Sequence, residues 1–255
     1  MINNIRLLIE YDGTNYHGWQ RQASPHGEEG DAHQTIQGTI EDVLTGIIKQ
    51  PAKVVAAGRT DAGVHAMGQV VHFKTTLQIN ESSWVKAINS LLPADIVVKK
   101  AEYVPEEFHA RFDAKSKVYR YVIINSGCPS PFLRNYVWHI KRPLDIALMR
   151  EASQYLIGHH DFSSFRASDC SAKSPVRTLD RLEIEEVSGE GIFLFTFEAR
   201  SFLQHMVRNI VGTLVEVGRG KIAPSDIGNI LEKRDRRSAG PIAPPQGLYL
   251  SEVMY

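Results

Sequence analysis

An aspartate in a glycine-bounded loop is the strongest candidate for chemistry in this sequence. Asp61 lies in the run GRTDAG at residues 58–63. Residues 54–57 before it are apolar, and residues 69–74 after it alternate as a half-buried strand does. The glycines permit backbone angles that other residues resist, so the loop is suited to presenting a side chain. Arg59, two residues before Asp61, can pair with the carboxylate, or both groups can face a ligand.

Two roles are open to this carboxylate. An aspartate beside Gly and Thr commonly caps the backbone amides of its own turn. Held in its ionised form, the same group can act as a nucleophile or a base. The spacing of residues around Asp61 by itself favours the turn-capping role.

Two tyrosines that flank an arginine form a second candidate group. Residues 118–124 read as a strand, which places Tyr119 and Tyr121 on one face and Arg120 on the other. An aromatic ring on a sheet face can stack on a nucleobase, and a phenol can exchange a proton. From the residues alone, a core aromatic is the more common role for Tyr119.

A cation inside an apolar helix is the third candidate. Arg208 lies in the run MVRNIVG at residues 206–212. Its guanidinium either reaches water at the helix border, which is the commoner outcome, or is held against a buried carboxylate. Leu248, in the run QGLYL at residues 246–250, is by its pattern only a strand residue.

Alternating strand and helix patterns position these residues. Pro51 and Pro93 follow two helical patterns and mark their ends. The first half predicts the order strand, helix, strand, strand, helix, strand. Its predicted elements are a strand at 5–11, a helix at 36–48, strands at 54–57 and 69–74, a helix at 84–92 and a strand at 96–98.

The second half begins the same order again. Its predicted elements are a strand at 118–124, a helix at 146–156, paired strands at 177–187 and 192–199 joined at 188–191, helices at 206–217 and 227–231, and a strand at 248–253. Residues 159–161 (HHD) read as a cluster at a helix end. Each half predicts a split β-α-β arrangement of the ferredoxin type.

We therefore predict an α+β fold with two ferredoxin-like lobes. The lobes are residues 1–104, which carry the Asp61 loop, and residues 105–255, which carry Tyr119, Arg208 and Leu248. Their antiparallel sheets are expected to join edge to edge around a central active-site cleft, the usual place for a large ligand.

The charges balance, with 29 basic and 29 acidic residues in 255. Global electrostatics therefore argue weakly against a nucleic-acid partner. Basic residues nevertheless cluster at 111–120, 141–142 and 233–237, and a local basic face can exist in a neutral protein. For the run at 233–237, solvated surface is the favoured interpretation.

The two cysteines, Cys128 and Cys170, cannot form a disulfide framework, which fits a reducing compartment. The N-terminus lacks the pattern of a signal peptide, and no apolar run approaches a membrane span. We therefore expect a cytoplasmic protein with no membrane partner.

Ten histidines raise the question of a metal site. His65 and His72 lack the helical i, i+4 spacing, and the cysteines are isolated, so no closed ligand set is predicted. No helix is predicted to follow residues 58–63, so that run is not a phosphate-binding glycine fingerprint. We expect no metal ligand among these residues.

Six motifs, in order along nearly the whole chain, resemble those of the TruA family of tRNA pseudouridine synthases. They are EYDG at 10–13, GWQRQ at 18–22, GRTDAGVHA with GQVVHF at 58–73, FSSFR at 162–166, MVRNIVG at 206–212 and GLYL at 247–250. The Tyr-Arg-Tyr triplet at 119–121 matches as well. One departure is the loop at residues 23–33, which is longer and more acidic than is usual in the family.

The resemblance implies an isomerase that converts uridine to pseudouridine at positions 38, 39 and 40 in the anticodon stem and loop of tRNAs. It implies that Asp61 is the catalytic nucleophile, and that a salt bridge from Arg208 keeps it ionised. Tyr119 is expected to stack on the base and to serve in proton removal from C5, and Leu248 to form an apolar wall. Arg59 is expected to fill the space left by the flipped nucleotide.

The family also implies that no cofactor is required and that the protein is a homodimer that binds one tRNA across both subunits. Attack by Asp61 at C1′, attack at C6 and assistance to loss of the base all remain open.

Two other classes of function are alternatives to this one. A non-catalytic RNA-binding protein on the same scaffold would have no use for an ionised acid in its cleft. A hydrolase would need a second carboxylate near the glycosidic bond, and Glu198 and Asp180 are candidates that no motif couples to Asp61.

Overall fold

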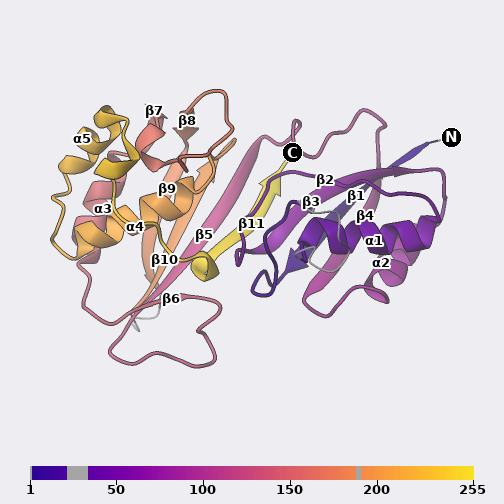
Figure 1. Ribbon diagram of the computed structural model, residues 1–255, viewed down its shortest axis with the longest axis horizontal. Coiled ribbons are helices and arrows are strands. Elements are labelled where there is room, and N and C mark those ends of the chain that lie inside the picture. Colours follow the sequence, from indigo (N-terminus) through magenta and orange to yellow (C-terminus); the bar gives the residue numbers. More distant parts are fainter. Residues whose placement is uncertain (1, 22–33, 188–190) are drawn as a thin grey trace, which may run out of the picture. The chain divides into compact units, whose positions relative to one another are not determined.

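The computed structural model describes residues 2–21, 34–187 and 191–255. The chain divides into two compact units, Met1–Lys115 with Leu250–Tyr255, and Ser116–Tyr249 (Figure 1). The acidic loop predicted at 23–33 and the last residue of the GWQRQ motif lie outside the described residues. No helix in the described part of the chain is long and apolar enough to cross a membrane.

An antiparallel sheet and two helices form the first unit. The sheet follows the order β4-β1-β3-β11, and the short β2 also pairs with β3. The elements in chain order are β1 (Asn3–Tyr11), α1 (Ile36–Ile48), β2 (Val55–Ala56), β3 (His65–Thr75), α2 (Glu81–Asn89), β4 (Ile96–Val104) and, from residue 250 onward, the C-terminal strand β11 (Leu248–Met254), whose first two residues belong to the second unit. The order from β1 to β4 is the one that the sequence predicts.

Local signals explain where α1 begins and ends. The hydroxyl of Thr35 accepts a hydrogen bond from the amide of Gly38, which caps the first turn. Ile40 and Leu44 are fully buried and fix the face that packs on the core. Lys49 ends the helix in the left-handed conformation, with φ 55°, two residues before Pro51.

In the second unit, β10 pairs antiparallel with both β5 and β9, and β6 pairs parallel with β5. A separate two-stranded sheet pairs β7 with β8. The strands are β5 (Ser116–Asn125), β6 (Trp138–Ile140), β7 (Gly158–Asp161), β8 (Val176–Leu179), β9 (Arg181–Val187) and β10 (Ile192–Ala199). The helices are α3 (Ile146–Gln154), α4 (Met206–Gly218) and α5 (Asp226–Lys233), with short 3-10 turns η1 (Ser163–Phe165), η2 (Arg236–Ser238) and η3 (Pro245–Gly247).

Helix α4 is the central element of this unit. Arg208 is its only residue that is not buried. A helix that is apolar on nearly every side belongs in a core, and α4 packs against α3 and η1. The sequence predicts this helix to within one residue.

Two predicted elements of the second half are wrong. Residues 159–161, read as a helix-end cluster, form β7, in which Asp161 pairs with Val176. The strand predicted at 177–187 is broken at Asp180 into β8 and β9, which belong to different sheets. Leu179 and Leu182 are both buried although they are three residues apart, so the alternation slips by one residue at the break.

Candidate active site

The loop that carries Asp61 is held by the N-terminal segment of its own unit. Thr60 is buried, and its hydroxyl lies 2.8 Å from the hydroxyl of Tyr11. Its carbonyl accepts a hydrogen bond from the amide of Trp19 at 3.0 Å. The carbonyl of Asp61 accepts from the amide of Val64 at 3.1 Å, which closes the turn. Burial raises the pKa of Tyr11 to about 12, so its phenol stays protonated and hydrogen-bonded near neutral pH.

Gly18 makes this close contact possible. Its φ is 88°, which side chains rarely adopt. A Cβ atom there would lie 2.9 Å from the carbonyl oxygen of Thr60 and 3.2 Å from the carbonyl carbon of Asp61. The GWQRQ motif therefore contributes a backbone surface on which the GRTDAG loop rests.

The loop presents its two charged residues differently. Arg59 is exposed, Thr60 is buried, and Asp61 is half-buried. At the start of the loop, the side-chain amide of Gln69 donates to the carbonyl of Gly58 at 2.8 Å. Partial burial strengthens the electrostatic interactions of a carboxylate because less water screens it.

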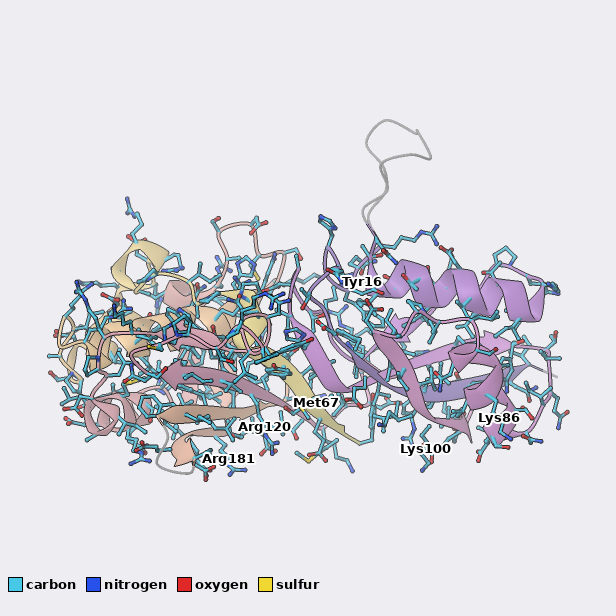
Figure 2. All side chains as sticks on the ribbon, turned by 90° about the horizontal axis from the view of Figure 1, so that it is seen from below. Tyr16, Met67, Lys86, Lys100, Arg120 and Arg181 are labelled. Carbon is cyan, nitrogen blue, oxygen red and sulfur yellow. The ribbon has the colours of Figure 1, made fainter. Side chains whose placement is uncertain are left out.

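Strand β5 places its tyrosines as the alternation predicts. Tyr119 and Tyr121 are buried, whereas Arg120 is exposed at the surface (Figure 2). The ring of Tyr119 meets that of Phe202 edge to face, with 5.0 Å between centroids. The hydroxyl of Tyr121 donates to the carbonyl of Pro244 at 2.7 Å. Burial raises the pKa of Tyr121, and the nearby charge of Arg208 offsets part of the rise.

Two hydrogen bonds with the backbone of Ala243, which we call the Arg208 clamp, fix the direction of the Arg208 side chain. Its Nε donates to the carbonyl of Ala243 at 2.8 Å, and the amide of Ala243 donates to the carbonyl of Arg208 at 3.1 Å. One turn further along α4, a Cβ atom on Gly212 would lie 1.8 Å from the carbonyl oxygen of Pro241. Glycine at this position lets the 241–243 segment approach the helix closely enough to make the clamp.

Leu248 is buried and directly follows η3. A Cβ atom on the preceding Gly247 would lie 2.6 Å from the ring of Tyr121. The segment from Ala243 to Leu248 therefore contacts Arg208 at one end and Tyr121 in its middle.

The candidate residues fall in both units. Arg59 and Asp61 belong to the first unit, and Tyr119, Arg208 and Leu248 belong to the second. Within the second unit, segment 243–248 links Arg208 to Leu248. The ring contact between Tyr119 and Phe202 does not involve segment 243–248.

Sequence reasoning missed the role of one arginine. Arg236, interpreted as solvated surface within the 233–237 run, donates to the carbonyl of Gly240 and to Oδ1 of Asn209, each at 2.9 Å. Burial lowers its pKa. Arg237 beside it is exposed and pairs with Asp235 at 2.8 Å. A charge run gives no sign of which member turns inward, so this correction requires the fold.

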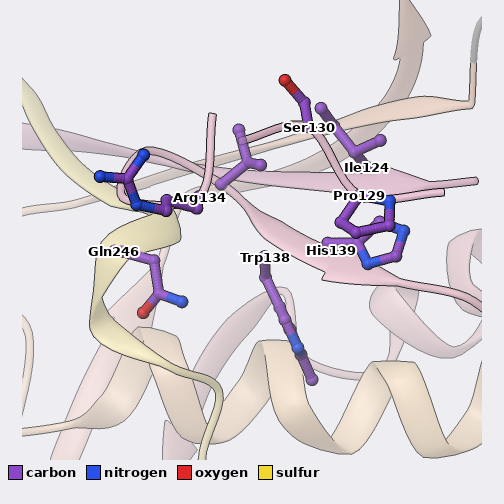
Figure 3. Close-up of a pocket in the computed structure, with 8 residues that line it drawn as sticks. Ile124, Pro129, Ser130, Arg134, Trp138, His139 and Gln246 are labelled. Atoms are coloured by element: carbon purple, nitrogen blue, oxygen red, sulfur yellow. The ribbon is translucent and has the colours of Figure 1, made fainter. Parts of the chain in front are cut away.

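Pockets form among the described residues of the second unit. The first has a volume of about 190 Å³; Arg134 and Gln246 flank one side of it, and Pro129 and His139 lie at the other (Figure 3). Gln246 belongs to η3, the turn that leads into Leu248. The second pocket, of about 220 Å³, is lined by arginines. Among the described residues, no group of three or more His, Cys, Asp and Glu side chains could hold a metal ion.

Comparison with known proteins identifies the family. The family profile described as tRNA pseudouridine synthase matches residues 7–113 and 152–255. The tRNA pseudouridine synthase A of Acetivibrio thermocellus is 46% identical over 254 residues, covering 100% of both chains. That of Moorella thermoacetica is 47% identical over 253 residues, covering 98% of this chain and 99% of its own. That of Pseudoalteromonas atlantica is 47% identical over 251 residues, covering 98% of this chain and 92% of its own. With matches of this length and identity, the chain belongs to the TruA family of tRNA pseudouridine synthases.

Proposed function

We propose that this protein isomerises uridine to pseudouridine in tRNA, at positions 38, 39 and 40 of the anticodon stem and loop. The observation that carries the proposal is the full-length similarity to relatives named tRNA pseudouridine synthase A. The structure of the GRTDAG loop supports it, because the contacts of Thr60 and Gly18 hold Asp61 in a fixed turn.

In this proposal Asp61 is the nucleophile. The reaction breaks the bond between N1 of uracil and C1′ of the ribose, and the base rotates and rejoins C1′ through C5. The hydrogen on C5 leaves and N1 gains one, so composition and oxidation state do not change. No cofactor or metal is required. Attack at C1′, attack at C6 and assistance to loss of the base are alternative roles for Asp61.

Arg208 is proposed to pair with Asp61 and to keep it ionised, as a neighbouring cation does. The Arg208 clamp supports this role because the hydrogen bond from Nε to the carbonyl of Ala243 directs the guanidinium. Tyr119 is proposed to stack on the target base and to take part in removing the C5 proton. Leu248 is proposed to form an apolar wall beside the base.

Arg59 is proposed to occupy the space of the extruded nucleotide. Base extrusion costs a few kcal/mol, and an inserted side chain offsets part of that cost. The exposure of Arg59 next to the half-buried Asp61 supports this role. The Arg59→Ala variant is expected to turn over folded tRNA more slowly than the wild type, and unchanged turnover would contradict the role.

The proposal includes the two ferredoxin-like lobes predicted at 1–104 and 105–255, a cytoplasmic location and a homodimer that binds one tRNA across both subunits. Light scattering on the purified protein tests the oligomeric state, because a mass near 28.6 kDa would indicate a monomer.

Chemical mapping of the product tests the proposed function. Unmodified tRNA transcripts are incubated with the protein, and pseudouridines are located by carbodiimide labelling and primer extension. Pseudouridine at positions 38, 39 or 40 is the expected result. Pseudouridine elsewhere would overturn the position, free uracil or abasic RNA would indicate the hydrolase, and unmodified but bound tRNA would indicate the RNA-binding alternative.

A further inference from the structure

A polar pocket in the second unit gathers three guanidinium groups. Its volume is about 220 Å³. It is lined by Ser163, Arg166, Ala167, Ser168, Arg234, Asp235 and Arg236. One wall is η1 with the residues after it, and the other is the end of α5 with the start of η2.

Hydrogen bonds hold the two walls in place. The side chain of Asn209 donates to the carbonyl of Phe165 at 2.8 Å and accepts from Arg236 at 2.9 Å. The buried hydroxyl of Ser164 donates to the carbonyl of Ile230 in α5 at 2.6 Å. The pocket is therefore a built feature of the fold, and Asn209 ties both of its walls to α4.

The nearby carboxylates already have partners. Oδ2 of Asp161 lies 3.3 Å from Nε of Arg234, and Asp235 is bound by two nitrogens of Arg237. Burial acts to raise the pKa of Asp161, but hydrogen bonds from Ser163 and two nearby guanidinium groups outweigh it and lower that pKa. Each carboxylate stays ionised and fixes an arginine.

Arg166 makes the pocket suited to an anion. It is half-buried, and among the described residues its guanidinium has no hydrogen-bond partner and no carboxylate within 4.0 Å. A partly desolvated guanidinium gains most from an anion that accepts two parallel hydrogen bonds, as a phosphate does. Among the residues that line the pocket, the three arginines outnumber the one aspartate by two positive charges.

We propose that this pocket binds a backbone phosphate of the tRNA substrate, a proposal that rests on the proposed function. Arg166 and Arg234 donate to the phosphate oxygens, and Ser163 and Ser168 line the same pocket. Through Asn209 the pocket is attached to the turn of α4 that carries Arg208. A phosphate held there would fix the position of the RNA strand relative to that turn, which is how phosphate contacts set register.

Filter binding of unmodified tRNA at several salt concentrations tests this site. The variants are Arg166→Gln, Arg234→Gln and the double variant, since neither side chain makes the hydrogen bonds of Asn209 and Ser164 that join the walls, and among the described residues the Arg234 side chain makes only the ion pair with Asp161. Arg181→Gln is the matched control, because Arg181 is an exposed arginine on β9 of the same unit, outside the pocket (Figure 2). We expect the magnitude of the slope of log K against log salt to fall by about 1 in the double variant, which loses the one phosphate contact, by no more than that in either single variant, and to stay unchanged in the control.

The outcomes separate this proposal from the proposed function. In the double variant, KM for tRNA is expected to rise several-fold while turnover at saturating tRNA stays near the wild-type value. Slopes equal to that of wild type in all variants would overturn the pocket assignment even if pseudouridine is made. Reduced slopes without any turnover by wild type would support the pocket and overturn the proposed function.

Inorganic phosphate distinguishes the source of the anion. If the pocket serves a free phosphate, inorganic phosphate will raise the Tm of wild type but not that of the double variant, and the salt slopes for tRNA will be equal. That result would overturn the assignment to RNA. Two results together would support it. The slopes are reduced in the pocket variants, and inorganic phosphate displaces tRNA only from proteins that keep both arginines.

Discussion

The chemistry proposed for Asp61 depends on the neighbouring residues that hold its loop. Thr60 is buried between Tyr11 and the backbone of Trp19, and Gly18 leaves room for the carbonyl that precedes Asp61. A carboxylate that must attack one atom requires a fixed backbone, because small displacements of reacting groups reduce rates steeply.

At this scale we predict that Gly18→Ala lowers both stability and turnover. The positive φ of Gly18 and the 2.9 Å approach of the Thr60 carbonyl act together, so the loop must move, at a cost of about 1–3 kcal/mol. Gly220→Ala is the control: its φ is 70° but nothing lies within 4 Å, so it carries the backbone strain without the clash. Thermal melting and turnover on tRNA are measured for both. Equal loss of turnover in the two variants would contradict the proposed support of the loop.

At the scale of elements, α4 and segment 241–243, which follows η2, pack closely against each other. The buried faces of the helix anchor it, Arg208 is its only residue that is not buried, and the close approach of Pro241 brings Ala243 within reach of the guanidinium. The glycine at 212 is therefore a packing requirement, although glycine lowers helix stability elsewhere.

Two glycine-to-alanine substitutions in helices test this packing. Gly46→Ala in α1 meets nothing within 4 Å and is expected to stabilise the protein by about 0.5–1 kcal/mol. Gly212→Ala in α4 would place a methyl group 1.8 Å from the carbonyl oxygen of Pro241, so it is expected to destabilise the protein and to lower turnover by moving the Arg208 clamp. Urea unfolding and turnover assays measure both effects. Stabilisation by both alanines would show that segment 241–243 does not need its close approach to α4.

Some elements were predictable because their patterns are strong. The alternation around Tyr119 and Tyr121 gives the faces of β5, and the unbroken apolar run around Arg208 gives α4. β7 is four residues of Gly, His and Asp, which carry no strand pattern, and it forms only because β8 lies beside it. Pairing between distant strands overrides such a weak local signal.

Some parts of the candidate site are also predictable from the sequence, and others are not. The motifs around Asp61, Arg208 and Leu248 indicate these residues as candidates. The inward turn of Arg236 and the bridging role of Asn209 depend on contacts between segments 27 and 44 residues apart along the chain. Residue type and local spacing do not encode such contacts.

At the scale of the whole molecule, the balanced charge means that RNA binding must come from local groups of cations. The pH dependence of the protein's stability is also set in part by tyrosine side chains that are shielded from water. Burial is the largest cause of a raised pKa at four tyrosines, namely Tyr11, Tyr16, Tyr121 and Tyr255. Ionising these groups favours the unfolded state, where they titrate at ordinary values.

We therefore predict that the protein loses stability above pH 10. The pKa of Tyr11 rises from 10.0 to about 12 on folding, so its contribution is full below pH 10 and is lost as the pH rises through about 12. The loss from Tyr11 alone is about 2–3 kcal/mol. Urea unfolding between pH 8 and about pH 12 measures it, with Tyr11→Phe as the comparison. A pH dependence as steep in Tyr11→Phe as in wild type would contradict the assignment.

The central claim is that Asp61 carries out the isomerisation. Its most direct test is tritium release from tRNA labelled at C5 of uridine, because formation of pseudouridine must expel that hydrogen. Wild-type protein and Asp61→Asn are compared, and equal melting temperatures establish that the variant is folded. The account predicts release by wild type and none above background by Asp61→Asn. Release by the folded variant at the wild-type rate would contradict the claim and leave Asp61 as a residue of the turn.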